Sequence, residues 1–219
     1  MAAEEDILLR LTQEKDKIPF DFDRKEKIND ALSKVKEFYV NDESTELLEL
    51  LNKRLTEVGG KLFIVDNIEE FLLELKKIKE ENKIKRLVSF NKNIVDKMLS
   101  VNVLIDSTEE ELLRSDASIT LCDYVAARTG TILVSGYSVL SRRIISYPDI
   151  HIVYAHISQL VYDMSEALEK FYKANKDKFP SFVSFITGAS KTADIEKTLI
   201  MGAHGPKKIY IFLSNNKIF

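Results

Sequence analysis

Short apolar runs alternate with amphipathic segments along most of this chain. The apolar runs are rich in β-branched and aromatic residues, which favour buried strands, whereas apolar residues spaced three and four positions apart favour helices. Repeated alternation of the two is typical of a mostly parallel sheet covered on both faces, so we predict a three-layer α/β sandwich. The predicted strands lie at residues 61–65, 86–90, 102–105, 117–120, 131–134, 150–154, 182–186 and 209–213.

The segments between these runs predict helices of different lengths. The first of them buries one apolar face and suits an end at Gly59-Gly60. We expect Ser107 and Glu110 to form the capping box of a short helix, and residues 122–128 to form a helical turn. After the strand at 150–154 we expect one helix that buries apolar residues from Ile157 to Phe171.

Residues 1–40 differ in composition from the rest of the chain. They are rich in Lys, Asp and Glu, and Pro19 interrupts two helical stretches. We therefore predict an N-terminal helical arm over residues 1–40, followed by one α/β domain over residues 41–219. A chain of 219 residues has the length for that organisation.

Charge and cysteine content narrow the possible functions. The formal net charge is −3, whereas nucleic-acid phosphates require a basic face, so we predict no nucleic-acid partner. Cys122 is the one cysteine, which excludes an intramolecular disulfide and a cysteine-ligated iron–sulfur cluster within this chain. The acidic N-terminus precedes no signal-peptide core and no apolar run reaches membrane-spanning length. We therefore expect a cytoplasmic protein without membrane insertion.

Hydrogen-bonding side chains concentrate in one segment near the C-terminus, which we call the closing motif. It reads Thr187-Gly188-Ala189-Ser190-Lys191-Thr192-Ala193-Asp194-Ile195-Glu196 and continues, eight residues later, with His204-Gly205-Pro206. Because it follows the apolar run 182–186, we expect a strand, a glycine turn and a helix that begins at Ser190. An anion could bind at that helix N-terminus, or Ser190 could simply cap the helix.

Three titratable residues of the closing motif are candidates for chemistry. His204 could act as a general base or a polar ligand contact, or it could fix the loop through backbone hydrogen bonds. Asp194 and Glu196 could form a carboxylate pair, although both would repel an anion unless Lys191 offset them. Because residues two apart on a helix do not share a face, we predict no metal site there.

A second polar turn, Thr129-Gly130-Thr131, precedes the strand at 131–134. Gly130 suits a helix C-cap, and the two threonines can project hydroxyl groups into a cleft. Ligands of open α/β sheets gather at the carboxyl ends of the strands, so we expect this turn and the closing motif to converge at that edge. Three residues in apolar surroundings are interpreted as packing residues: His151, His156 and Cys122.

These motifs resemble the signature of the lactate-utilisation protein C family, also called the LUD domain. Its closing motif runs roughly T-G-P-S-R-T-A-D-I-E and then G-x-H-G-P. An earlier block runs G-I-T-x-A-D and then A-x-T-G-T-L, which resembles residues 116–120 and 126–133 here, and Pro148 and His151 fit the family spacing P-x-x-H. This chain departs from the pattern at Ala189, Lys191 and Arg128.

The resemblance implies a sheet like that of ribose-5-phosphate isomerase and the CoA transferases. It also implies an accessory or substrate-binding subunit of an iron–sulfur-dependent system that oxidises L-lactate to pyruvate. Its partners would be iron–sulfur oxidoreductase subunits and its ligand a small organic acid, with no cofactor of its own. A stand-alone enzyme acting on a small anionic sugar or acyl substrate and a non-catalytic regulatory module are the alternatives, so catalysis by this chain stays open.

The candidate site residues follow from the two motifs. The candidate catalytic residues are His204, Asp194 and Glu196. The candidate ligand-binding residues are Thr129, Gly130, Thr131, Thr187, Gly188, Ser190, Lys191, Thr192 and Gly205.

Overall fold

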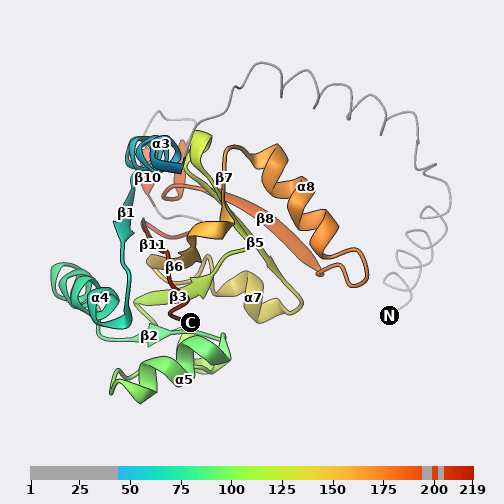
Figure 1. Cartoon of the computed structure of the whole chain (residues 1–219). Coiled ribbons are helices and arrows are strands. Elements are labelled where there is room, and N and C mark those ends of the chain that lie inside the picture. The colour runs from blue at the N-terminus through green and yellow to red at the C-terminus, as the bar shows by residue number, and fades with distance from the viewer. Residues whose placement is uncertain (1–43, 194–198, 202–204) are drawn as a thin grey trace, which may run out of the picture. The chain divides into compact units, whose positions relative to one another are not determined.

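The computed structural model describes residues 44–193, 199–201 and 205–219. The predicted arm over residues 1–40 lies outside these ranges and stays a prediction. Over the described residues the chain forms two sheets and a separate hairpin, with helices packed against the sheets (Figure 1).

The central sheet is parallel throughout. Its strands lie in the order β1 (Gly60–Ile64), β11 (Lys208–Ser214), β6 (Ile150–His156), β3 (Ala117–Leu121) and β2 (Leu87–Val88). Every neighbouring pair in this order runs parallel. The amino ends of these strands therefore share one edge of the sheet and the carboxyl ends share the other.

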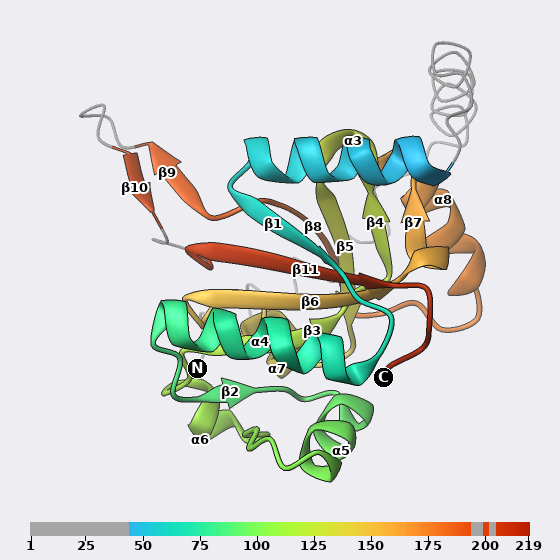
Figure 2. The same cartoon turned by 60° about the vertical axis from the view of Figure 1, so that its left-hand side comes forward.

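The second sheet is smaller and mainly antiparallel. Its strands lie in the order β7 (Leu160–Val161), β4 (Tyr124–Ala126), β5 (Thr131–Gly136) and β8 (Phe182–Thr187). Strand β5 runs antiparallel to both β4 and β8, and β7 runs parallel to β4. Strands β9 (Lys191–Ala193) and β10 (Leu199–Met201) form a hairpin that extends away from both sheets (Figure 2).

Helices cover one face of the central sheet. Helices α4 (Ile68–Asn82) and α5 (Lys92–Ser100) place Phe71 and Met98 in one apolar core with Ile152 and Phe212 of the sheet. The rings of Phe71 and Phe212 have centroids 4.6 Å apart. Figures 1 and 2 show α4 and α5 on this side and the second sheet on the other.

A second core fills the space between the two sheets. It combines Leu55 of α3 (Ser44–Glu57), Ile132 of β5, and Val153 and Ile211 of the central sheet. Val153 enters this core while its neighbour Ile152 enters the first, because successive side chains of a strand point to opposite faces. Helix α8 (Met164–Ala174) covers the outer face of the second sheet through Phe171.

The predicted α/β fold with a mostly parallel central sheet is confirmed. The second sheet was not predicted, because residues 122–128 were expected to form a helical turn. They contain instead strand β4 and the 3-10 turn η1 (Ala127–Thr129). Pairing of β4 with both β5 and β7 overrides its local preference, since tertiary context decides the state of a short apolar segment.

Other differences from the sequence prediction are smaller. Residues 102–105 form no strand, and the neighbouring Asp106 makes only an isolated bridge to Val88. The capping box lies one residue later than predicted, with Thr108 and Glu111 before and within α6 (Glu109–Leu112). The helix expected from residue 157 is preceded by the 3-10 turn η2 (Ile157–Gln159) and by β7, and it begins at Met164.

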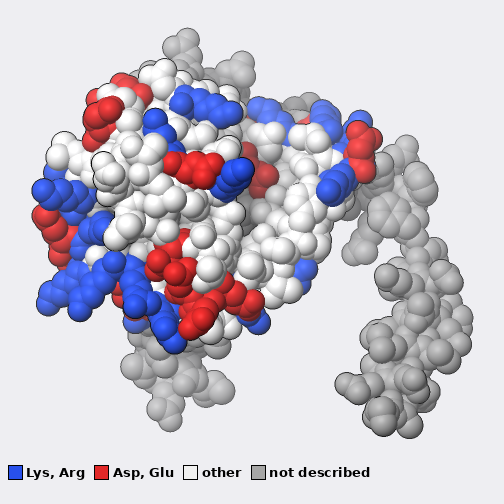
Figure 3. All heavy atoms as spheres, turned by 90° about the horizontal axis from the view of Figure 1, so that it is seen from below, with Lys and Arg blue, Asp and Glu red and all other residues white. Residues whose placement is uncertain are grey.

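Among the described residues, no helix has the length and apolar character to cross a lipid bilayer. Figure 3 shows acidic and basic side chains interspersed over the face seen from below, with Lys and Arg gathered most densely at its left. This face is therefore not uniformly basic.

Candidate functional site

The described parts of the two predicted site segments meet. Thr131 at the start of β5 pairs with Thr187 at the end of β8, and their Oγ1 atoms lie 2.7 Å apart. The backbone N–H of Ser190 donates to the carbonyl of Pro206 at 2.8 Å. The turn at 129–131, the start of the closing motif and Gly205 are thus adjacent.

Tight backbone packing explains the glycines at this junction. Gly130 has φ +62°, and a Cβ atom there would lie 2.8 Å from the backbone nitrogen of Leu55 in α3. Gly188 has φ +68°, and a Cβ atom there would collide with the carbonyl oxygen of Val58. Both glycines are required by the approach of the chain to the end of α3, whether or not a ligand binds nearby.

Two expectations about the closing motif are wrong. No helix begins at Ser190, because residues 191–193 pair with residues 199–201 in the β9–β10 hairpin. The junction also does not lie at the carboxyl edge of the central sheet, since Gly59 precedes β1 and Gly205 precedes β11. It lies at the amino ends of those two strands and at the carboxyl end of β8.

Several predicted site residues lie on or beyond the hairpin. Lys191 is exposed on β9, and the side chain of Thr192 is outside the described part of the structure. The three candidate catalytic residues also lie outside the described residues: His204, Asp194 and Glu196.

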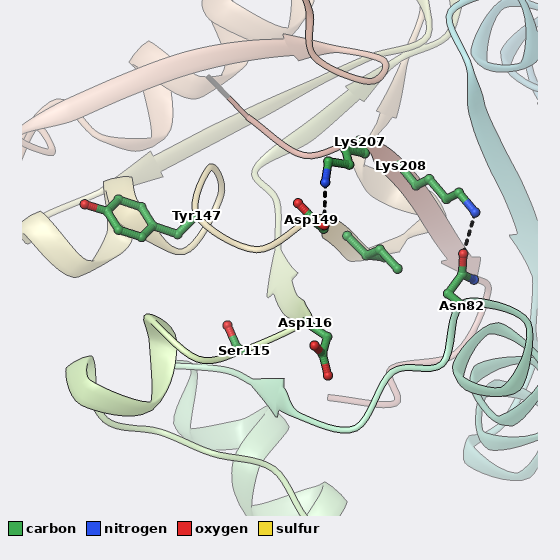
Figure 4. Close-up of a pocket in the computed structure, with 8 residues that line it drawn as sticks. Asn82, Ser115, Asp116, Tyr147, Asp149, Lys207 and Lys208 are labelled. Atoms are coloured by element: carbon green, nitrogen blue, oxygen red, sulfur yellow. Dashed lines mark hydrogen bonds and ion pairs between the residues drawn. The ribbon is translucent and has the colours of Figure 1, made fainter. Parts of the chain in front are cut away.

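A pocket of about 320 Å³ lies beside this junction, at the amino edge of the central sheet (Figure 4). We call it the amino-end pocket. Lys207 pairs with Asp149 at 2.8 Å, and the ammonium group of Lys208 donates to Asn82 Oδ1 at 2.5 Å. The Asp116 carboxylate accepts backbone hydrogen bonds from residues 85 and 86 at 2.7 and 2.9 Å. These charged groups therefore already have partners within the protein.

A second cavity, of about 330 Å³, lies at the opposite edge, where β2 and β3 end. We call it the strand-end cavity. Its polar lining comes from segments far apart in sequence: Ser89, Asn91, Thr120, Asp123, Ser135 and Ser141. Asn91 also caps α5 by accepting a hydrogen bond from the Ile94 backbone at 3.2 Å, so the N-cap residue of that helix lines the cavity. Apolar side chains, among them Ile144 and Ile145, complete the wall.

Burial controls the ionisation of two residues that line the strand-end cavity. Burial raises the pKa of Asp123, and hydrogen bonds with the side chain and backbone of Ser135 only partly oppose that effect. Burial also raises the pKa of the Cys122 thiol far above its usual range, and the neighbouring Asp123 adds to the effect. The Cys122 thiol therefore ionises less readily than an exposed thiol, and the Asp123 carboxyl group binds a proton more readily than an exposed carboxyl group.

A buried histidine contacts Thr120, one of the residues that line the cavity. His151 on β6 is 0% exposed, and its Nε2 lies 2.8 Å from Oγ1 of Thr120. Desolvation lowers the pKa of His151 to about 4, so the imidazole is neutral near pH 7. Its Nδ1 atom and the hydroxyl of Ser118, the residue opposite on β3, are buried without hydrogen-bond partners among the described residues.

Comparison with known proteins identifies the family. A sequence model of the LUD domain matches residues 26–214. The chain belongs to the LUD domain family. Its similarity extends to lactate utilization protein C of Halalkalibacterium halodurans, with 28% identity over 179 residues that cover 74% of this chain and 76% of that protein.

Other members match more closely over a shorter stretch. Lactate utilization protein C of an Exiguobacterium species is 34% identical over 48% of this chain and 46% of its own length. The protein of that name from Deinococcus radiodurans is 32% identical over 47% of this chain and 48% of its own length. The chain spans about half the length of these two relatives in the matched regions.

A solved structure supports the fold of the LUD domain described above. The crystal structure of a DUF162 family protein from Deinococcus radiodurans superposes with a TM-score of 0.60 and covers 80% of this chain and 99% of that one. The two sequences are 21% identical, so the likeness concerns the fold alone.

Sequence reasoning on this LUD domain missed the strand-end cavity. A usable signal was present, since Ser89 and Asn91 lie one and three residues after β2, and Asp123 lies two residues after β3. His151 and Cys122 are buried, as predicted, and His156 caps η2 and contacts the Asn215 carbonyl at 2.8 Å. Among the residues that the structure describes, no three His, Cys, Asp or Glu side chains group closely enough to bind a metal ion.

Proposed function

We propose that this LUD domain protein is the accessory or substrate-binding subunit of an iron–sulfur-dependent system that oxidises L-lactate to pyruvate. The observation that carries the proposal is the match over 74% of the chain to a relative named lactate utilization protein C. The strand-end cavity is its proposed binding site for a small organic acid. Its position, at the carboxyl ends of parallel strands, is where open α/β sheets bind ligands.

The lining of the strand-end cavity suits a hydroxy acid. A cavity of about 330 Å³ is at the small end of ligand-binding pockets. Asp123 can accept a hydrogen bond from the lactate hydroxyl, while Asn91 and the serines can donate to carboxylate oxygens. Because Asn91 is the N-cap residue of α5, the positive end of that helix dipole also favours an anion near this part of the cavity.

Electron balance supports a partner subunit. Conversion of L-lactate to pyruvate releases two electrons and two protons, and the electrons need an acceptor. These 219 residues contain one cysteine, too few to ligate an iron–sulfur cluster, so in the proposal a partner holds the cluster. In this arrangement the LUD domain binds the acid and presents it to the oxidoreductase partner.

The closing motif is the second candidate position for the ligand. We propose His204, Asp194 and Glu196 as its catalytic residues, with binding by the segments 129–131 and 187–192 and by Gly205. The contact between Thr131 and Thr187 supports this grouping. Strand β5 connects the two candidate positions, because Thr131 begins it and Ser135 lies four residues on, roughly 14 Å away in an extended strand.

Ligand binding by the purified protein tests the proposal. L-Lactate and pyruvate should stabilise the protein, by about 2.7 kcal/mol at a concentration 100 times the dissociation constant. Asp123→Asn should reduce this effect if the strand-end cavity is the site, whereas Asp194→Asn and His204→Ala should remove it if the closing motif is the site. Lys208→Ala, in the amino-end pocket, is the control that should leave it unchanged.

Two further results separate the alternatives. Turnover of a sugar phosphate or CoA ester by the purified chain alone would identify a stand-alone enzyme. A protein that binds none of these compounds would fit a non-catalytic module. Affinity purification from native cells should recover an iron–sulfur oxidoreductase, and repeated recovery without one would contradict the subunit proposal.

A further inference from the structure

The hydrogen bond between Thr120 and His151 indicates which kind of ligand atom the strand-end cavity binds next to β3. Thr120 lies on the last part of β3 and lines the cavity, whereas His151 is fully buried on the neighbouring strand β6. The Thr120 hydroxyl forms a hydrogen bond with the imidazole, with 2.8 Å between Oγ1 and Nε2. One of the two groups donates the proton of this bond, and the direction decides what the hydroxyl can offer to a ligand.

The imidazole can donate in only one of its neutral tautomers. Burial keeps His151 neutral near pH 7, so one ring nitrogen carries a proton and the other carries a lone pair. If Nδ1 carried the proton, a buried N–H group would lack an acceptor within the described part of the protein, because neither Ser118 nor any other described group bonds to Nδ1. Buried N–H groups without an acceptor are rare and costly.

The tautomer with the proton on Nε2 carries a lone pair on Nδ1 instead, so it leaves no buried N–H group without an acceptor. Its N–H group donates to Oγ1 of Thr120, which leaves the hydroxyl proton of Thr120 free of the imidazole. Thr120 then has a donor to offer to an atom in the cavity that it lines. A serine or threonine hydroxyl without such a neighbour rotates freely between donating and accepting.

We propose that His151 fixes the Thr120 hydroxyl as a hydrogen-bond donor toward the strand-end cavity, where it binds an oxygen of a carboxylate or carbonyl group. Thr120 is the ligand-binding residue, and His151 is a positioning residue that acts through it. The inference rests on the proposed function in placing the ligand in this cavity. It adds which atom of the ligand, an oxygen acceptor rather than a hydroxyl donor, lies next to β3.

Nuclear magnetic resonance of the histidine side chains tests the direction of the bond. The chain has three histidines, so single Gln substitutions at positions 151, 156 and 204 assign their ring nitrogens. At pH 7 the wild-type protein should show His151 with its proton on Nε2 and in slow exchange with water. Thr120→Val, which keeps the shape but removes the acceptor, should shift the Nε2 signal. A proton on Nδ1, or a signal that Thr120→Val leaves unchanged, would overturn the inference whichever ligands bind.

Ligand binding by matched variants tests the role of the donor. Pyruvate and L-lactate should bind about tenfold more weakly to Thr120→Val, the size expected for one lost hydrogen bond to a charged group. Thr120→Ser should bind as the wild type does. His151→Gln, which can present an amide N–H to Oγ1, should keep most of the affinity, whereas His151→Met should lose part of it while still folding.

The outcomes separate this inference from the proposed function. Binding of L-lactate that is unchanged in Thr120→Val would reject the role of Thr120 and leave the lactate proposal standing. Binding of a sugar phosphate or CoA ester that is weakened by Thr120→Val would support the role of Thr120 and reject lactate. Failure of all these probes to bind the wild-type protein would reject both.

Discussion

The two edges of the central sheet hold polar residues in different ways. At the amino edge, Lys207 and Asp149 are 51% and 59% exposed and bond to each other. At the carboxyl edge, Ser89 is 0% exposed and burial raises the pKa of Asp123, and both residues line the strand-end cavity. Burial of polar groups costs free energy that hydrogen bonds only partly offset, so buried polar side chains that line a cavity point to a ligand-binding role. At the amino edge, by contrast, close backbone packing alone explains Gly130 and Gly188 of the two sequence motifs.

The largest expected effect concerns packing at the amino edge. Gly188→Ala should lower the free energy of unfolding by about 4 kcal/mol, because the new methyl group combines left-handed backbone strain with a collision against the Val58 carbonyl. Gly59→Ala is the matched control, since Gly59 also has a positive φ, +83°, but its Cβ would lie 3.9 Å from the nearest atom. Gly59→Ala should cost about 1 kcal/mol. Urea unfolding of both variants measures the difference, and equal losses would contradict the packing account of Gly188.

The second effect concerns pH and the buried His151, which contacts Thr120 of the strand-end cavity. His151 has a folded pKa of about 4, below its usual 6.5, so the unfolded chain binds the proton more readily. The stability of the wild-type protein should therefore be unaffected by this group above pH 6.5 and should fall by about 3 kcal/mol as the pH is lowered to 4. His151→Gln should remove this component from the pH dependence. Urea unfolding between pH 4 and 8 tests it, and identical pH profiles of the two proteins would show that burial does not suppress protonation of His151.

The fold could be predicted from the sequence where the signal is local. Strands β1, β6 and β11 were located to within two residues, because each is a β-branched or aromatic run. β6 and β11 are buried in the central sheet, whereas β1 is its partly exposed edge strand. Strands β4 and β9 were missed for one reason: each is three residues long and is held by pairing with a distant or following segment. The residues within such a short strand do not by themselves predict which segment the strand pairs with.

The candidate site was less predictable than the fold. The proximity of the two segments was expected, and the contact between Thr131 and Thr187 confirms it. The prediction that they meet at the carboxyl edge of the central sheet was wrong, because the junction lies where the neighbouring strands β1 and β11 begin. Asp123 was missed because its burial depends on residues of β5 and α7 (Val139–Arg143), which are adjacent only in the folded chain. Whether His204, Asp194 and Glu196 act in catalysis stays a prediction.

The third effect compares ligand binding at the two edges. Asp123→Asn should weaken binding of L-lactate about tenfold or more, the loss expected for one charge-assisted hydrogen bond. It should not reduce stability at pH 7, because burial raises the pKa of Asp123 and the ionised carboxylate is therefore unfavourable in the folded state. Lys208→Ala at the amino-end pocket should leave affinity unchanged. Calorimetric titration measures all three proteins, and a larger loss in Lys208→Ala would move the site to the amino edge.

The smallest expected effect is the contribution of the Lys207–Asp149 ion pair, in the amino-end pocket, to the free energy of unfolding. Lys207→Ala removes the ion pair with Asp149, in which both side chains are more than half exposed. Water screens such a pair and both side chains lose rotamer freedom to form it, so the free energy of unfolding should fall by less than about 1 kcal/mol. The loss should shrink further in 1 M salt, where the screening length is about 3 Å. Asp149→Asn, which removes the same charge pair from the other side, is the matched variant. A loss of several kcal/mol in either variant, insensitive to salt, would show that this pair supports the junction between β6 and β11 and that the amino edge is not merely a solvated surface.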